Sequence, residues 1–278
     1  MTPDPRVTLA RPDLAARKLE GVLAAAAYAD TRPMVVAAPC APLRRAAAAE
    51  SEQLDQVLFG EIFDVLETRD GFAWGQARRD GYVGFVALDA LAGEGEAPQW
   101  RVSAIRAYAF AEPSIKSRAL GPYSLNALVR EEAREGRFVK AAGGGWFVDR
   151  HLSPIGSDFE TDWASVAERF AGAPYLWGGR ESLGLDCSGL VQQALYACGR
   201  GCPRDTDQQQ AAFAPVEAEV LRRGDLVFWR GHVALMLDGE RIIHANAHHM
   251  AVAVEPLAEA VARVREAGGG EPTGHRRP

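Results

Sequence analysis

The sequence predicts a multidomain protein in which two small all-β domains precede a larger α+β domain. In the first half of the chain, short runs of β-branched and aromatic residues recur between Asp-Gly and other turn signals. In the second half, a glycine-rich loop leads into an apolar segment with helical spacing, and strand-like apolar runs follow. A chain of 278 residues is long enough for two or three domains that each have a core.

The first segment, residues 1–32, is expected to be a helical arm. Prolines near the start of the chain exclude a long early helix. Asp13 is a suitable N-cap, and the stretch from Leu14 to Ala29 is rich in Ala, Leu and Lys. We assign no chemistry to this arm.

The two β domains are expected at residues 33–97 and 98–155. In the first, strand-like runs are separated by the turns Arg69-Asp70-Gly71 and Arg79-Asp80-Gly81. A long insertion at 46–58 interrupts this pattern, and we expect it to be helical. In the second domain, the run G-G-G-W-F-V parallels the run D-G-Y-V-G-F-V of the first.

The third domain is expected at residues 156–268, followed by a flexible tail at 269–278. Helices are expected from Trp163 to Ala171, through the apolar segment after Cys187 and from Ala258 to Glu266. Four strands of one antiparallel sheet are expected at 226–229, 232–237, 241–245 and 251–255.

Cys187 is the strongest candidate for a nucleophile. It stands at or just before a helix N-terminus, where backbone N–H groups and the helix dipole favour an anion. We therefore expect its thiol pKa to be lowered, because the thiolate is the reactive form. The alternative is that Cys187 is a small buried apolar residue. The polar neighbours Asp186 and Ser188 favour the first interpretation.

Two histidines could complete the catalytic group. His232 starts an apolar strand-like run and would act as the base, forming a thiolate–imidazolium pair with Cys187. His244 lies in a buried-strand pattern and would orient His232 as the third member of a triad. Asn246 is the rival for that third position. Either histidine could instead be a structural residue with a satisfied hydrogen bond.

These residues belong to a set of ordered motifs that resembles the NlpC-type family of papain-like cysteine peptidases, which act on bacterial cell-wall peptides. The motifs are Tyr175-Leu176-Trp177-Gly178-Gly179, Asp186-Cys187-Ser188-Gly189-Leu190, Gly224-Asp225-Leu226-Val227-Phe228, Gly231-His232-Val233-Ala234 and Ile243-His244-Ala245. The first half of the chain is similar to bacterial SH3-like domains. The resemblance thus implies two SH3-like barrels followed by an α+β papain-like catalytic domain.

The resemblance also implies roles for further residues. Tyr175 would help to polarise the scissile carbonyl together with the backbone N–H of Cys187. Asp186 and Ser188 would contact the free amino group of the substrate, although an aspartate at this position is most often only a helix cap. From the first SH3-like domain, Glu61 and Tyr82 would hold the amino-terminal L-alanine; the alternative is surface charge and a barrel aromatic residue. Arg204 and Asp205 would line the cleft or form a structural ion pair.

Composition restricts the partners. A net charge of −6 without a basic cluster argues against nucleic acid, and no apolar run is long enough to span a membrane. The first residues lack the layout of a signal peptide, so we expect a cytoplasmic protein. The four cysteines fit a reducing compartment. Cys198 and Cys202 lack a second ligand pair at zinc spacing, so we expect no metal there. The reaction that the resemblance implies requires no metal or organic cofactor.

The resemblance implies a cysteine endopeptidase that hydrolyses the bond between γ-D-glutamate and an L-diamino acid, meso-diaminopimelate or L-lysine. The substrate would be a free cell-wall peptide that begins with L-alanine, as in murein recycling. The alternatives are an amidase or acyltransferase acting on another small amide, and a non-catalytic protein that binds the cell wall through its SH3-like domains. The sequence leaves the oligomeric state open.

Overall fold

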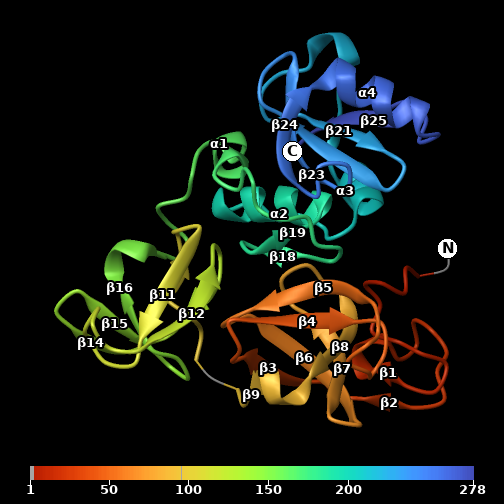
Figure 1. The fold of residues 1–278 in the computed structure, drawn as a ribbon. Helices are drawn as coiled ribbons and strands as arrows, with labels where there is room; N and C mark the ends of the chain where they lie inside the picture. The colour runs from red at the N-terminus through yellow and green to blue at the C-terminus, as the bar shows by residue number, and fades with distance from the viewer. Residues whose placement is uncertain (1–2, 95) are drawn as a thin grey trace. The chain divides into compact units, whose positions relative to one another are not determined.

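The computed structural model describes residues 3–94 and 96–278, and the chain divides into two compact units, Met1–Ser157 and Asp158–Pro278 (Figure 1). Residues 1–2 of the predicted arm and residue 95 of the predicted first β domain lie outside the described residues. Among the described residues, no helix is both long and apolar enough to cross a membrane.

The N-terminal unit begins with a β module built on a seven-stranded sheet in the order β5-β4-β8-β7-β6-β3-β9. Residues alternate between buried and partly exposed along the first part of β6, as expected for a strand with one face on a core. Asp70 and Gly71 have positive φ angles of 52° and 78° at the turn that joins β6 to β7. The elements are β3 (Arg32–Val36), β4 (Cys40–Arg44), β5 (Gln53–Leu58), β6 (Ile62–Arg69), β7 (Phe72–Ala77), β8 (Val83–Ala87), the 3-10 helix η2 (Leu88–Ala90) and β9 (Leu91–Ala92).

Two predictions for this region are wrong. The arm is not helical: it forms β1 (Ala15–Ala16), the short 3-10 helix η1 (Arg17–Leu19) and β2 (Tyr28–Ala29), because Leu9 and Ala16 pack into a cluster with Trp74 and other aromatic residues of the β module. The insertion at 46–58 is not helical either. Its second half is β5, which pairs with β4 and buries Val57 and Leu58, so core packing outweighs the helix propensity of the preceding alanines.

The second β module of this unit contains a five-stranded sheet, β12-β11-β16-β15-β14, and a three-stranded sheet, β13-β10-β17. Its core includes Phe59, Tyr123 and Phe147, whose ring centroids lie 4.8–6.4 Å apart. The prediction of a second β region is confirmed. The elements are β10 (Trp100–Val102), β11 (Arg106–Phe110), β12 (Ala119–Ser124), β13 (Leu128–Val129), β14 (Glu131–Glu135), β15 (Phe138–Ala141), β16 (Trp146–Val148), η3 (Asp149–His151) and β17 (Leu152–Pro154).

The C-terminal unit is an α+β structure with a six-stranded sheet in the order β20-β25-β21-β22-β23-β24. Helix α2 contacts β22 and β23, and α4 joins a separate apolar cluster with residues of β21, β22 and β23. The strands are β18 (Arg180–Glu181), β19 (Gly184–Leu185), β20 (Ala214–Pro215), β21 (Leu226–Trp229), β22 (His232–Met236), β23 (Arg241–Asn246), β24 (Ala251–Pro256) and β25 (Gly274–Arg277). The helices are α1 (Trp163–Glu168), α2 (Cys187–Ala197), α3 (Thr206–Ala212), η4 (Ala218–Val220) and α4 (Leu257–Glu266).

The predicted helices and the four predicted strands of this unit are confirmed, but the predicted flexible tail is wrong. Residues 274–277 form β25, which pairs antiparallel with β21 (Figure 1). Within β25, Arg277 makes an ion pair of 2.7 Å with Asp225, whose side chain is 1% exposed. The basic end of the chain therefore neutralises a buried carboxylate and covers the β21 edge of the sheet.

Candidate active site

The glycine-rich loop positions Cys187 by closing over the first turn of α2. The N-cap residue Asp186 accepts hydrogen bonds from the backbone N–H groups of Gly189 at 2.8 Å and Gly178 at 3.0 Å. At Gly189, a Cβ atom would lie 2.2 Å from the carbonyl oxygen of Gly179. Only glycine therefore allows the loop to approach the helix this closely, which explains the glycine that follows Cys187-Ser188.

Arg204 completes the support of this turn. Its guanidinium donates to both carboxylate oxygens of Asp186, at 3.0 and 2.6 Å, and to Ser188 Oγ at 2.8 Å. Arg204 is 1% exposed, so the ion pair is buried. The structure thus gives Asp186 a capping and ion-pairing role. A substrate amine would share a carboxylate that already accepts hydrogen bonds from two backbone N–H groups, the Arg204 guanidinium and the Ser188 hydroxyl. Asp205 forms a capping box with Gln208 at the start of α3.

The thiol of Cys187 is 7% exposed, and its environment differs from the one we predicted. Burial raises its pKa to about 12, and the charge of Asp186 adds to this effect. Hydrogen bonds from the backbone of Val233 and Ser188, together with Arg204, oppose the shift without reversing it. The prediction of a lowered thiol pKa is wrong because desolvation of the thiolate outweighs the helix N-terminus.

His232 follows a tight turn, in which Gly231 has φ of 74°, and starts β22. Burial and the neighbouring His244 lower the pKa of His232 to about 3. Burial therefore disfavours the charged form of each group, the thiolate of Cys187 and the imidazolium of His232. The thiol proton has to move to a base as the sulfur attacks.

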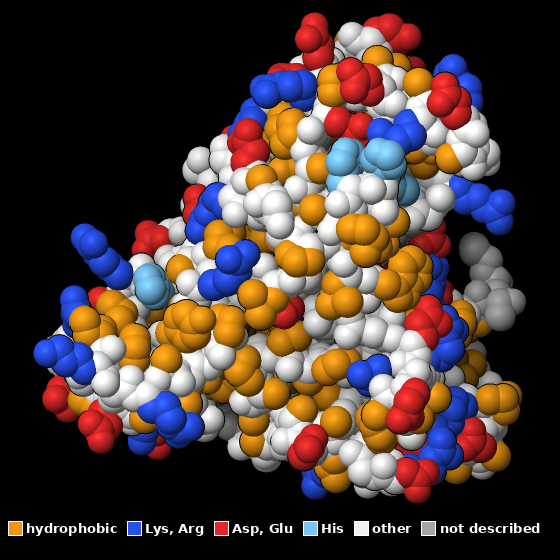
Figure 2. Space-filling model, viewed as in Figure 1, with side chains coloured by type: hydrophobic (Ala, Val, Ile, Leu, Met, Phe, Trp, Pro, Cys, Tyr) orange, Lys and Arg blue, Asp and Glu red, His pale blue; other side chains and the backbone are white. Residues whose placement is uncertain are grey.

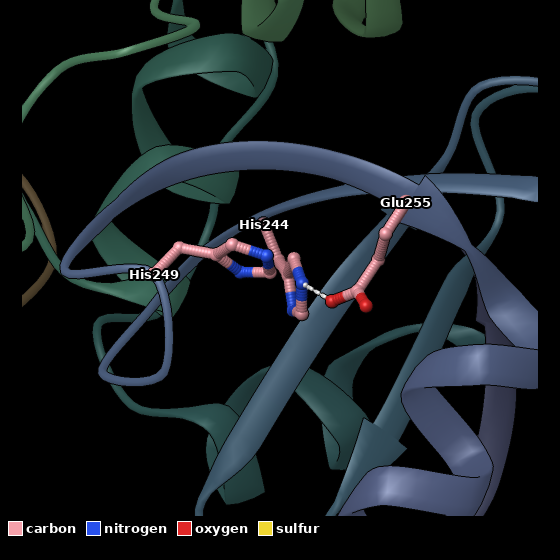
Figure 3. A group of neighbouring side chains, drawn as sticks. All are labelled: His244, His249 and Glu255. Carbon is pink, nitrogen blue, oxygen red and sulfur yellow. Dashed lines mark hydrogen bonds and ion pairs between the residues drawn. The ribbon is translucent and has the colours of Figure 1, made fainter.

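A chain of hydrogen bonds leads away from His232. Its Nε2 lies 2.8 Å from His244 Nδ1. On the other side of the His244 ring, Nε2 lies 2.6 Å from Glu255 Oε1 (Figure 3). Arg263 donates to both oxygens of Glu255, at 2.5 and 2.6 Å. Asn246 instead donates its amide to the His244 carbonyl at 3.3 Å. In this structure His244, and not Asn246, contacts the imidazole of His232.

The register of the sheet explains why these side chains meet. Met236 pairs with Ile242, and Ile242 pairs with Glu255. Directly paired residues of antiparallel strands share a face, and so do residues two apart on one strand. His232, His244 and Glu255 therefore lie on the same face of the sheet. Ile242 and Met236 of this face pack in one cluster with Ala260 of α4, the helix that supplies Arg263.

His244, His249 and Glu255 offer ligand atoms within 4.8 Å of one another, which raises the question of a metal site. Figure 3 shows the His249 ring on the other side of His244 from Glu255. Two imidazoles and a carboxylate are zinc-type ligands. However, His244 uses both ring nitrogens in hydrogen bonds, and Arg263 neutralises both oxygens of Glu255. These contacts fit a hydrogen-bonded network better than a cation site.

Exposed histidines mark this part of the surface. Histidine side chains gather in one patch on the visible face of the C-terminal unit (Figure 2). His248 and His249 are exposed, with ring centroids 4.7 Å apart, and His249 Nδ1 lies 3.0 Å from Asn246 Oδ1. Both lie in the loop that joins β23 to β24.

Tyr175 is half-buried next to this site. Burial raises its pKa to about 12, and the charge of Asp186 adds to the shift. The phenol therefore remains protonated and can donate a hydrogen bond. This protonation state is the one that its predicted role at the scissile carbonyl requires.

Glu61 and Tyr82 lie in the N-terminal unit. Glu61 is 2% exposed, accepts a hydrogen bond from the backbone of Leu58 at 3.0 Å and lies 3.4 Å from Arg79. Tyr82 is 4% exposed and belongs to the core cluster of the first β module. Both are built into this module, and their contact with a substrate remains a prediction.

Glu255 and Arg263 are the site residues that sequence reasoning missed. Glu255 interrupts an otherwise apolar alternation in β24. Pairing that strand with the His244 strand would have placed the carboxylate on the histidine face. The contact of Arg263 with Glu255 depends on how α4 packs against the sheet, and no local sequence pattern indicates that packing.

A cysteine at a helix N-terminus, with a hydrogen-bonded histidine pair on an adjacent antiparallel sheet, defines the class of papain-like thiol enzymes. Comparison with known families agrees. Residues 172–267 match the NlpC/P60 family, and residues 43–91 match the bacterial dipeptidyl-peptidase Sh3 domain. The chain therefore combines an NlpC/P60 domain with a bacterial SH3 domain.

Two relatives are gamma-D-glutamyl-L-lysine dipeptidyl-peptidases. The one from Bacillus cereus is 29% identical over 52% of this chain and 43% of its own length. The one from Bacillus subtilis is 33% identical over 33% of this chain and 34% of its own length. The chain thus spans less than half the length of these relatives. A solved NlpC/P60 family protein from Bacillus cereus has the same fold, with a TM-score of 0.74 over 88% of this chain and 99% of its own, at 19% identity.

Proposed function

We propose that this protein is a cysteine peptidase that cleaves the bond between γ-D-glutamate and an L-diamino acid in free cell-wall peptides with an amino-terminal L-alanine. The observation that carries the proposal is the buried Cys187 at the start of α2, together with the His232–His244 pair. The names of the relatives from Bacillus cereus and Bacillus subtilis support the substrate class.

The chemistry follows from the protonation states of the site. Cys187 Sγ attacks the γ-carbonyl carbon while its proton passes to His232, since both groups are neutral at rest. The Tyr175 hydroxyl and the Cys187 backbone N–H stabilise the oxyanion. His232 then gives the proton to the leaving amine, and a thioester forms at Cys187. Water, deprotonated by His232, hydrolyses the thioester and releases the dipeptide.

We further propose that Glu61, Tyr82, Asp186 and Ser188 contact the amino-terminal alanine of the substrate. The match of residues 43–91 to a dipeptidyl-peptidase Sh3 domain supports the participation of the first two. Under this proposal the second β module is also SH3-like. The partner is a small muropeptide and not nucleic acid or a membrane. The enzyme works on recycled murein peptides in the cytoplasm.

The test compares L-Ala-γ-D-Glu-L-Lys, the corresponding meso-diaminopimelate peptide and the N-acetylated form of each, with products followed by mass spectrometry. We expect cleavage of the free peptides alone and none by Cys187→Ala. If the acetylated peptides are cleaved equally well, the assignment as a peptidase holds, but the proposed recognition of the free amino group by Glu61 and Tyr82 fails. If no peptide is cleaved, the substrate assignment fails and another small amide has to be sought.

A further inference from the structure

We propose that Glu255 is a positioning residue that acts through His244 to fix which ring nitrogen of His232 carries the proton. The proposal rests on the proposed function, since it assigns His232 as the base. Glu255 lies on β24, eleven residues beyond His244 in the chain, and reaches His244 Nε2 at 2.6 Å (Figure 3). Glu255 lies within residues 172–267, which match the NlpC/P60 family.

The direction of each hydrogen bond follows from simple donor and acceptor rules. An ionised carboxylate can only accept, so His244 Nε2 carries the hydrogen that Glu255 receives. A neutral imidazole has one N–H, so His244 Nδ1 is left with a lone pair. That lone pair accepts from His232 Nε2–H across 2.8 Å. His232 Nδ1 is then unprotonated, which is the form that can receive a proton from a thiol.

The opposite orientation would disable the base. If His244 Nδ1 carried the hydrogen, it would donate to His232 Nε2 and leave the proton of His232 on Nδ1. The imidazole would then have no lone pair on the nitrogen that His244 does not contact. A residue that only accepts at His244 Nε2 excludes this arrangement, whereas a residue that can both donate and accept allows it.

Arg263 keeps Glu255 in the accepting state. Burial works to raise the pKa of Glu255, but hydrogen bonds from Arg263 and His244 lower it overall. Arg263 contacts both carboxylate oxygens and is anchored on α4, whose Ala260 is fully buried against the sheet. Glu255 therefore stays ionised at neutral pH.

Burial gives the network its control over the tautomer. His244 is 2% exposed and Glu255 is 9% exposed, so bulk water does not compete freely for these atoms. Hydrogen bonds in such surroundings are stronger, and a buried donor without an acceptor is costly. When His232 takes up the thiol proton, the carboxylate of Glu255 also stabilises the resulting imidazolium through His244.

The decisive variant is Glu255→Gln, which keeps the shape of the side chain but can both donate and accept. Long-range proton–nitrogen spectra of protein labelled with ¹⁵N-histidine report the tautomer of each ring. In the wild type we expect both His232 and His244 to carry hydrogen on Nε2. In Glu255→Gln we expect a mixture with a measurable fraction of the Nδ1–H form at His232. The proposal is overturned by Nδ1–H at His232 in the wild type, or by tautomers that the variant leaves unchanged.

Kinetics provide the second readout. By analogy with residues that orient metal-bound histidines, we expect Glu255→Gln to lower kcat by about 10- to 100-fold with little change in KM. Iodoacetamide alkylation of Cys187 should slow in parallel. The matched control is Glu266→Gln, an exposed glutamate at the end of α4, which should behave as wild type. A wild-type kcat in Glu255→Gln would contradict the proposal.

Two further features keep the test interpretable. If Glu255→Gln does not fold, Arg263→Gln replaces it as the test variant. In Arg263→Gln the Glu255 carboxylate loses its two guanidinium hydrogen bonds, so we expect a smaller fraction of the Nδ1–H form at His232 than in Glu255→Gln. Wild-type tautomers in Arg263→Gln would count against the proposal. The spectra and the alkylation need no peptide substrate. Failure of the wild type to cleave the peptides would therefore refute the proposed substrate, while unaltered tautomers would refute the role of Glu255.

Discussion

Arg204→Leu should strongly destabilise the C-terminal unit. Arg204 lies in a buried site, where it donates hydrogen bonds to both carboxylate oxygens of Asp186 and to the hydroxyl of Ser188. Its removal leaves the Asp186 carboxylate buried with no cationic partner, held only by the backbone N–H groups of Gly178 and Gly189 and the hydroxyl of Ser188. Removing one partner of a buried ion pair typically costs about 3–5 kcal/mol. We expect a decrease in the free energy of unfolding within that range.

Arg223→Leu is the matched control. Arg223 pairs with Asp162 at 2.8 Å and Glu168 at 2.7 Å, but all three side chains are more than a third exposed. Exposed pairs contribute about 0–1 kcal/mol, because solvent screens the charges and the side chains lose entropy. Arg223 also donates to Ser165 Oγ and to the carbonyl of Leu237. Both variants therefore remove an arginine with several hydrogen bonds, and the difference between them reports the effect of burial.

Amide hydrogen exchange in α2 is the suitable assay, because it reports on this unit even if the two units unfold separately. We expect the slowest amides between Leu190 and Ala197 to lose about 3–5 kcal/mol of protection in Arg204→Leu and less than about 1 kcal/mol in Arg223→Leu. Equal losses in the two variants would refute the view that the Arg204–Asp186 pair supports the turn that carries Cys187.

Three further predictions concern charge and protonation. Because burial raises the pKa of Cys187 to about 12, the far-ultraviolet thiolate absorbance near neutral pH should be the same in the wild type and in Cys187→Ala; an excess in the wild type would show a preformed thiolate. The pKa of His232 is about 3 in the folded protein and has an ordinary value of 6.5 in the unfolded chain, so the unfolded state binds more protons between these pH values. The free energy of unfolding should therefore fall as the pH drops through this window, and it should fall less steeply in His232→Gln. Equally steep dependence on pH in the two proteins would contradict the burial of a neutral imidazole. Arg277→Leu should lower the free energy of unfolding by about 1–3 kcal/mol in urea denaturation, because Asp225 then loses its charged partner; an unchanged value would argue against a structured C-terminal strand.

The sequence was most informative where local chemistry dictates structure. The glycines around Cys187 and the apolar alternation before and after His232 indicated the α2 turn and the strands correctly. The alanine-rich stretch from Leu14 to Ala29 shows the limit of local propensity. Its apolar residues pack on aromatic residues of the β module, and that tertiary contact overrides a preference for helix.

Contacts between residues far apart in the sequence explain the other differences between the predicted and the observed structure. The charged residues near Arg277 are typical of a solvated tail, but pairing with β21 and the ion pair with the buried Asp225 make them part of the sheet. The thiol pKa of Cys187 depends on how much of the chain covers it, which a helix N-terminus does not reveal. Glu255 was likewise hidden, since its role depends on the register between two strands.

Trapping of the acyl-enzyme tests the central claim most directly. The protein is mixed with L-Ala-γ-D-Glu-L-Lys, quenched in acid during turnover, digested and analysed by mass spectrometry. We predict an L-Ala-γ-D-Glu thioester on the peptide that contains Cys187, and no adduct in Cys187→Ala. Turnover that persists in Cys187→Ala, or an acyl group found only on Cys40, Cys198 or Cys202, would contradict a mechanism in which Cys187 is the nucleophile.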